Sequence, residues 1–579
     1  MVVLLVVVAV AAIVGGAALL GSGTALISKN DARQSVLETA ADAGLEEARS
    51  RINGARITGD TTLYPSTGFR VLEAGVTVYA ADGSAIPNVN RWLYVGPSGV
   101  TTGQYGVFGS IVAVTQDVQG DRIVRRADVS QESFSKYAYF TTQEGPIQFA
   151  NGDQIFGPVH SDDDLHIAAS GATFFGPVST ARTIVGRANG IYKQGFKERA
   201  AFIPMPTTAD LNKLRTQALT GNTAITSTLL GNAGQATTRI EFVALDLNND
   251  GDSSDVDEGF MKVYQVTSAA NAFWVMADTN NWSAKGVTES PNCGHVDATG
   301  FKTFERHGTS GPDAKSVAPG NGTPGLRCYL GGADILNNPI GFQSSDSRGR
   351  WLPWSGIVDP RLASLRLFQG DAQYFWPITR ALNPNFKGVV YVDGKVAVSG
   401  RLRGRVTLAA TDNIIIADDI TYVTNPGAVN CADILGLFSG HDIVVADNLI
   451  NDPIPWLSGK TATHWDPVYD ESIDGFILAL GSFTAQNFNQ GSKNAERCAP
   501  RDAGRGCLNV TGGIIQAVRG AVGWTSGEGY VKRYSYDQCG ASDPPPYFPT
   551  TGHFVPGHSY EVDPTGFDIG AYWNLLTPR

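Results

Sequence analysis

The densest group of potential metal ligands in this sequence is the segment DLNNDGDSSDVDE, residues 246–258. Its side chains and backbone offer carboxylate, amide and carbonyl oxygens, which are the ligands that Ca²⁺ prefers in proteins. Acidic or amide residues stand at the first, third and fifth positions, and a glycine at the sixth allows a sharp turn. The predicted ligands of a structural Ca²⁺ are Asp246, Asn248, Asp250, Asp252 (through its carbonyl), Ser254 and Asp257.

This spacing resembles the calcium loops of EF-hand and dockerin-type proteins. It departs from them at the twelfth position, where Asp257 replaces the usual glutamate and Glu258 follows one residue later. The flanking segments EFVAL and GFMKVY predict strands in place of the usual helices. The carboxylates between Asp246 and Asp257 repel one another unless a cation lies among them. We therefore favour calcium, with a solvated acidic turn as the alternative.

A second cluster, HSDDDLH from His160 to His166, has two imidazoles and three carboxylates. These side chains could bind a transition metal. The composition is also ordinary for a polar turn between two strands. We favour the turn.

A catalytic interpretation depends on Arg401, Arg403 and Arg405, whose spacing of two predicts a shared strand face. The carboxylates Asp412, Asp418 and Asp419 follow them. Such a set could cleave polysaccharide, whereas a solvated outer face is the simpler explanation. The sequence contains no Ser/His/Asp arrangement, phosphate-binding loop or dinucleotide fingerprint. The chain is therefore predicted not to be an enzyme.

The elements that position these residues begin with an apolar N-terminus, since no charged residue occurs from Met1 to Ile27. A helix of this length spans ~40 Å, enough for a hydrocarbon core of ~30 Å. Residues 28–52 are polar but keep a helical apolar stripe of Leu37, Ala41, Leu45, Ala48 and Ile52. One helix is thus predicted to be membrane-like in its first half and to pack on a soluble domain in its second.

This two-part helix has the layout of a type IV pilin. The segment ETAADAGLEEARSRI resembles the same region of PilX-type minor pilins and pseudopilins, although Leu5 stands where most major pilins have glutamate. The resemblance implies a small antiparallel sheet beside the helix and assembly of copies of the chain through residues 1–27. It also implies anchoring in the inner membrane before assembly. A plain single-pass anchor and a signal peptide are the alternatives. No basic residue precedes the apolar run, as expected of a sequence that begins at or near a mature end.

Composition favours a large β-rich exported protein. The chain has 579 residues, 67 glycines, 29 prolines and only 17% charged residues, which predicts two to four domains with many turns. A net charge of −11 argues against nucleic-acid binding. Six cysteines in an exported chain predict disulfides, and a zinc site is the alternative. We pair Cys498 with Cys507 and Cys293 with Cys328, which leaves Cys431 with Cys539.

Repeated phrases predict a parallel β-helix, with an antiparallel sandwich as the alternative. IFGPVHS at Ile155 returns as FFGPVST at Phe174, 19 residues later, and NIIIADDI at Asn413 returns as DIVVADNL at Asp442, 29 residues later. These phrases also resemble an uncharacterised bacterial family in which a PilX-like N-terminus precedes a β-rich ectodomain. Between the repetitive regions, residues 206–220 predict a helix with Thr207 or Thr208 as its N-cap.

We thus expect a mainly β protein with a long N-terminal helix. The predicted parts are the pilin helix 1–55, a pilin-like antiparallel β domain 56–135, the start of a parallel β-helix 136–200, a loop-rich insertion 201–375 and β-helix rungs with a cap 376–579. The predicted function is a structural subunit of a type IV pilus-like filament at the bacterial surface, whose β-domain acts in adhesion to a surface or polysaccharide ligand. The alternative is a membrane-anchored β-helix protein that binds or cleaves polysaccharide.

Overall fold

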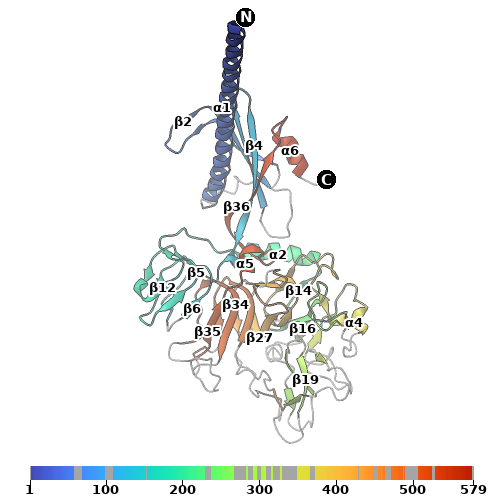
Figure 1. Cartoon of the computed structure of the whole chain (residues 1–579). Helices are drawn as coiled ribbons and strands as arrows, with labels where there is room; N and C mark the ends of the chain where they lie inside the picture. The colour runs from blue at the N-terminus through green and yellow to red at the C-terminus, as the bar shows by residue number, and fades with distance from the viewer. Residues whose placement is uncertain are drawn as a thin grey trace. The chain divides into compact units, whose positions relative to one another are not determined.

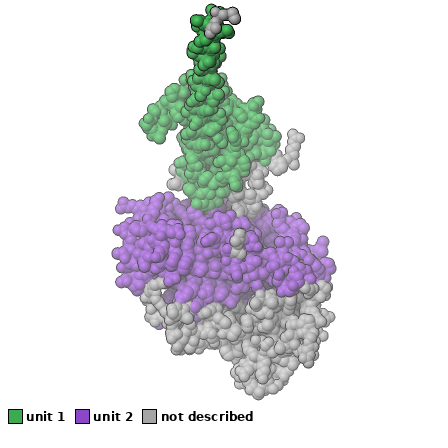
Figure 2. All heavy atoms as spheres, in the orientation of Figure 1, with its two compact units in different colours: residues 1–132, 552–579 green, residues 133–551 purple. Residues whose placement is uncertain are grey.

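The computed structural model contains two compact units (Figures 1 and 2). Unit 1 consists of residues 1–132 and 552–579, and unit 2 of residues 133–551. The structure describes residues 2–57, 68–97, 108–150, 153–227, 236–248, 250–266, 282–284, 291–296, 302–307, 314–316, 327–328, 349–364, 372–427, 430–446, 454–457, 460–462, 471–486, 488–489, 506–524 and 528–576.

Unit 1 is a helix on a five-stranded sheet. Helix α1 (Val2–Ile57) precedes β1 (Arg70–Tyr79), β2 (Ala85–Pro97), β3 (Phe108–Asp117), β4 (Arg122–Ser133) and, from the other end of the chain, β36 (Thr550–Val562). The sheet order is β1-β2-β3-β4-β36, and the pairs from β1 to β4 are antiparallel. The small antiparallel sheet expected after the N-terminal helix is therefore present.

The two faces of this sheet are covered by different helices, because side chains alternate along each strand. Ile111 and Ala113 of β3 pack against the α1 stripe, which includes Ala41, Leu45, Ala48 and Ile52. Val112 and Val114 face the other way and contact Ile569 and Tyr572 of α6 (Ile569–Leu576). The predicted stripe of α1 is thus the face that packs on the sheet.

The C-terminal residues differ from the expected division of the chain. The sequence predicts that 376–579 form rungs and their cap, whereas residues 552–579 lie in unit 1 and contribute β36 and α6. Unit 2 is therefore inserted into unit 1, between β4 and β36. Phe134 donates its N–H to the carbonyl of Pro549 at 3.0 Å, so the two ends of the insertion lie side by side, as an inserted domain requires.

Unit 2 is built on one large sheet of short, mostly parallel strands (Figure 1). Its first strands are β5 (Tyr139–Gln143), β6 (Asp153–Ile155), β7 (Val159–Ser161), β9 (Ala172–Phe174), β10 (Val178–Thr180), β12 (Gly190–Tyr192) and β13 (Phe196–Lys197). They are followed by β14 (Ala224–Thr226), β15 (Thr238–Ala244), β16 (Gly259–Val266), β22 (Gly349–Trp351), β23 (Trp376–Pro377), β24 (Val389–Asp393), β25 (Val396–Leu402), β26 (Arg405–Ala410) and β27 (Ile414–Tyr422). The last are β28 (Ile434–Ser439), β29 (Ile443–Val445), β32 (Glu471–Ala479), β33 (Phe483–Ala485), β34 (Cys507–Val518) and β35 (Val531–Ser535).

The described residues of unit 2 also form smaller elements. β8 (Leu165–His166) pairs with β11 (Ile184–Val185), and β17 (Trp282–Ala284) joins β31 (Lys460–Ala462) and β30 (Ile454–Leu457). A further sheet contains β18 (Pro291–Val296), β19 (Lys302–His307), β20 (Ala314–Ser316) and β21 (Arg327–Cys328). The helices are α2 (Thr208–Thr220), α4 (Arg361–Ser364), α5 (Cys539–Ser542) and the 3-10 turns η2 (Phe134–Lys136), η3 (Arg187–Asn189) and η5 (Ala372–Tyr374).

The repeated phrases of the sequence lie beside each other in parallel register. Ile155 of β6 is paired with Phe174 of β9, at the predicted interval of 19 residues. Ile414 of β27 is paired with Ile443 of β29, at the predicted interval of 29. Stacking of equivalent positions places Val, Ile and Leu side chains above one another in one continuous buried core.

Strand order in the large sheet differs from chain order. The series β5, β7, β10 and β13 leads away from β34, because Tyr139 of β5 pairs with Ile514 of β34. The chain then forms α2, which begins after the predicted N-cap Thr207, and continues to β14. Since β14 pairs with β24, the remaining strands return through β26, β28 and β32 to β34. The expected insertion 201–375 therefore contributes strands to the sheet.

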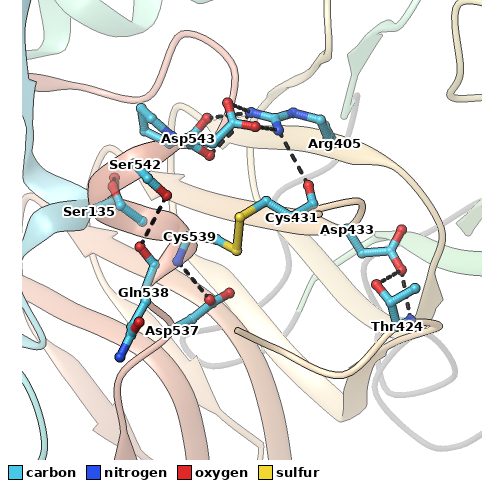
Figure 3. Close-up of a disulfide and its surroundings, with 12 residues drawn as sticks. Ser135, Arg405, Thr424, Cys431, Asp433, Asp537, Gln538, Cys539, Ser542 and Asp543 are labelled. Atoms are coloured by element: carbon cyan, nitrogen blue, oxygen red, sulfur yellow. Dashed lines mark hydrogen bonds and ion pairs between the residues drawn. A yellow bond between two sulfur atoms is a disulfide. The ribbon is translucent and has the colours of Figure 1, made fainter. Parts of the chain in front are cut away.

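One predicted disulfide, Cys431–Cys539, is present and joins residues 108 positions apart (Figure 3). Asp537 accepts the N–H of Cys539 at 2.9 Å, and Arg405 donates to the Cys431 carbonyl at 3.3 Å and to the carboxylate of Asp543. The bond therefore fixes the end of unit 2 to the middle of its strand series. Cys507 is also disulfide-bonded. Its predicted partner Cys498 lies outside the described residues, and so do the side chains of the predicted pair Cys293–Cys328.

Candidate functional site

The most exposed apolar surface is the first half of α1, residues 3–27, which we call the apolar stem. No side chain among these residues is buried, and thirteen large apolar ones are exposed, with Val3 at 77% and Leu19 at 75%. By length and composition, α1 is long and apolar enough to cross a membrane. The stem thus presents a surface that a membrane or another apolar helix would cover.

Four glycines lie in the stem, and each has open space where a side chain would be. Gly15, Gly16, Gly21 and Gly23 therefore have no packing reason within this chain to be small. Each costs ~1 kcal/mol of helix stability relative to alanine. Small residues do, however, allow close approach of a second helix, which gives them a use outside the chain.

The predicted calcium ligands lie in the loop between β15 and β16. Asp246 is buried, and its carboxylate accepts the N–H of Asp250 and of Gly251, both at 3.1 Å. The side-chain carbonyl of Asn248 accepts the N–H of Asp250 at 3.0 Å. Gly251 has φ +102°, in the region that favours glycine, so the expected sharp turn is present. The ligands predicted at the first, third and fifth positions of the loop thus lie close together around the turn.

The last three predicted ligands are arranged differently. Asp252 accepts the N–H of Ser254 at 2.8 Å, whereas Asp257 forms an ion pair with Arg361 of α4 at 2.7 Å. Asp255, which the pattern does not assign, accepts a hydrogen bond from the Asn248 amide at 2.8 Å. Asp257 would have to leave Arg361 in order to close a calcium site.

Glu258 closes the loop instead. Its carboxylate accepts the N–H of Leu247 at 2.7 Å and of Asp255 at 2.8 Å, and burial raises its pKa. Within the described residues, no three His, Cys, Asp or Glu side chains are arranged as a metal site. The carboxylate and amide oxygens of the loop are nevertheless suitable calcium ligands, because a carboxylate that accepts backbone N–H groups still has lone pairs for a cation.

The HSDDDLH segment is tied into the protein as a polar corner. His160 is buried, stacks on Phe140 and contacts Ser179 Oγ at 2.8 Å and Asp162 Oδ1 at 3.1 Å. Asp163 Oδ2 accepts the N–H of Glu144 at 3.2 Å, and Asp164 Oδ1 accepts the N–H of Thr183 at 2.9 Å. These contacts are those of a turn between stacked strands.

The predicted shared face of the three arginines is wrong. Arg401 lies in β25 and Arg405 in β26, with Gly404 at φ +110° in the turn between them. Arg403 is buried, donates to the Asp255 carbonyl at 3.0 Å and pairs with Asp433 at 2.7 Å. Arg401 donates to the Val423 carbonyl at 3.2 Å. These side chains hold strand ends together and do not converge on a cleft.

The carboxylates of the catalytic alternative also bind backbone. Asp412 Oδ1 accepts the N–H of Asn413 at 2.7 Å, and Asp419 Oδ1 accepts that of Ser472 at 2.6 Å. The side chain of Asp418 lies outside the described residues.

Comparison with known proteins finds similarity only among solved structures. No protein-family model matches the chain, and no curated protein matches it. Among solved structures, it is similar to the crystal structure of the competence-associated pilin ComZ from Thermus thermophilus, at 10% sequence identity over 90% of this chain and 96% of that chain, with a TM-score of 0.26.

Proposed function

We propose that this chain is a structural subunit of a type IV pilus-like extracellular filament, assembled through the apolar stem. The observation that carries the proposal is the division of α1. Its second half packs on the antiparallel sheet of unit 1, whereas none of the stem is buried. A helix with one buried and one unpartnered half needs a partner for the second. The PilX-type resemblance of residues 38–52 supports the same assignment.

The stem would serve two environments in turn. Before assembly it would lie in the inner membrane, and afterwards it would pack against the stems of other copies. Moving one Leu, Val or Ile side chain out of water stabilises either state by roughly 1.5–3 kcal/mol. Because lipid and a helical bundle are both apolar, transfer between them costs little, and the glycines would permit the close packing.

Unit 2 would be the surface-displayed part of the filament. We propose that its parallel strands wind as a β-helix, which the pairing of strands at intervals near 20 residues supports. A solenoid presents an extended surface at low cost per repeat, which suits adhesion. We also propose that the 246–258 loop binds a structural Ca²⁺. No described arrangement of side chains favours the polysaccharide-cleaving alternative.

Replacing Val8 with Asp tests the filament proposal. A carboxylate among apolar side chains costs several kcal/mol, so filaments visible by electron microscopy should be lost. Val8→Leu is the matched control and should assemble normally. The Cys431–Cys539 bond and the protease resistance of unit 2 should be unchanged in both variants, which separates assembly from folding. Normal filaments with Val8→Asp would overturn the proposal.

A further inference from the structure

A groove of about 600 Å³ lies where three stacked strands of unit 2 end. Thr141 of β5, Ser161 of β7 and Thr180 of β10 are paired in register. The residues that follow each of them therefore lie side by side and line the groove, together with Phe202. The described lining residues are Thr142, Gln143, Gly145, Asp162, Asp163, Ala181, Arg182 and Phe202. The volume is within the range of roughly 300–1,000 Å³ that ligand pockets occupy.

The lining contains buried polar atoms without a partner. The side chain of Asp162 is 1% exposed, and its Oδ1 contacts His160 Nε2 at 3.1 Å and accepts the N–H of Ile203 at 2.9 Å. Among the described residues, its other oxygen, Oδ2, has no hydrogen-bond partner, and neither does Thr142 Oγ1. An unsatisfied buried carboxylate oxygen destabilises the fold, and such an atom calls for an explanation beyond packing. A ligand that donates a hydrogen bond beside this corner would provide one.

The accessible part of the groove offers charge of both signs and an aromatic ring. Arg182 is 65% exposed and pairs with Asp163 at 3.0 Å. Phe202 is 58% exposed. The two carboxylates would repel a small anion in this groove, and the guanidinium of Arg182 would repel a small cation. An apolar ligand would leave the polar groups without hydrogen-bond partners. Neighbouring hydroxyl groups both donate and accept, and the C–H face of a sugar ring can lie on an aromatic ring.

We propose that this groove binds a sugar unit of a polysaccharide. The inference rests on the adhesive part of the proposed function and names its ligand class. Arg182 would donate to hydroxyl oxygens, Asp163 would accept from hydroxyl groups, and Phe202 would pack on the ring.

Calorimetric titration of the full chain tests this, in a detergent without a sugar headgroup so that the detergent cannot compete. The probes are dextran, which is neutral, and alginate, which carries uronates. Phe202→Ala and Asp163→Asn should each weaken binding by about tenfold or more, the size expected for one aromatic or charged contact. The control Phe196→Ala removes an exposed ring that does not line the groove and should bind like the parent chain.

Binding of either polysaccharide that only the two groove variants weaken supports the proposal. It is overturned if neither polysaccharide binds, if the variants and the control bind alike, or if duplex DNA displaces the bound polysaccharide without any effect of Phe202→Ala. Unchanged protease resistance of the variants shows that they are folded. The Val8→Asp chain should still bind the polysaccharide. Failure of the filament proposal and failure of the sugar-binding proposal can therefore be told apart.

Discussion

At the scale of single residues, Asp474 is a half-buried carboxyl group that destabilises the folded state near neutral pH. Burial raises its pKa to about 6, and the nearby Asp537 adds to this, whereas the hydrogen bonds from the Tyr422 N–H at 3.0 Å and the Thr511 side chain only partly offset it. The folded state therefore binds a proton more tightly than the unfolded state, whose carboxyl has a pKa of ~3.9. The stability that this proton provides is present below pH ~4 and is lost as the pH rises through about 6.

Asp474→Asn should therefore stabilise unit 2 at pH 7.5, by roughly 1–3 kcal/mol, because an amide needs no proton and still accepts from Tyr422. Thermal unfolding followed by near-ultraviolet circular dichroism measures this. As the pH rises from 4 to 6, the stability of the variant should also decrease less than that of the parent chain. Asp393→Asn, at an exposed strand end, is the control and should change neither. A less stable Asp474→Asn at pH 7.5 would contradict the argument.

At the scale of elements, the repeated phrases predicted which strands are neighbours, because parallel stacking keeps equivalent residues in register. The β6–β9 and β27–β29 pairs follow directly from the intervals of 19 and 29. The face of the arginines could not be predicted in the same way, since it depends on the left-handed turn at Gly404. The place of β36 in unit 1 was also missed, because its local pattern is that of any strand and its partners are remote in sequence.

The loop between β15 and β16 shows the same limit at a candidate site. Local spacing correctly placed Asp246, Asn248 and Asp250 around one turn. It could not foresee that Asp257 pairs with Arg361, because α4 comes from a distant part of the chain. Glu258 lies one residue after the twelfth position of the calcium-loop pattern. Its carboxylate accepts the N–H groups of Leu247 and Asp255.

Calcium should protect this loop from proteolysis. The carboxylates of the loop repel one another without a cation, so a chelator should increase cleavage within 246–258 and lower the melting temperature modestly. Asp250→Ala should have the same effect and make the chain indifferent to the chelator. Asp82→Ala, in the turn between β1 and β2 of unit 1, is the control and should leave the calcium response intact. Absence of heat on calcium titration, with no change in cleavage, would leave the segment as an acidic turn only.

At the scale of the whole molecule, unit 2 is inserted between two segments of unit 1, so the first and last residues of unit 2 must lie close together. The chain enters at Phe134 and leaves at Pro549, which are hydrogen-bonded to each other. Between them, the paired strands lead from β5, beside β34, to β13. Helix α2 then connects to β14, and the following strands lead back to β34. The contacts of the returning strands, α5 and the Cys431–Cys539 bond hold the last part of unit 2 against its first strands. The Ser135 hydroxyl adds to them by donating to the Gly540 carbonyl at 2.6 Å.

Replacing Cys431 and Cys539 together with serine should therefore destabilise unit 2 and spare unit 1. A disulfide that closes a loop of this length is worth up to ~4–5 kcal/mol by its effect on the unfolded chain. Hydrogen exchange measured by mass spectrometry on the full chain should show faster exchange in 531–549 and in β28, with unchanged exchange in β2 and β3. The parent chain under reducing conditions should behave in the same way. If β2 and β3 lose protection to the same extent, the two units unfold as one cooperative body and the disulfide stabilises the molecule as a whole.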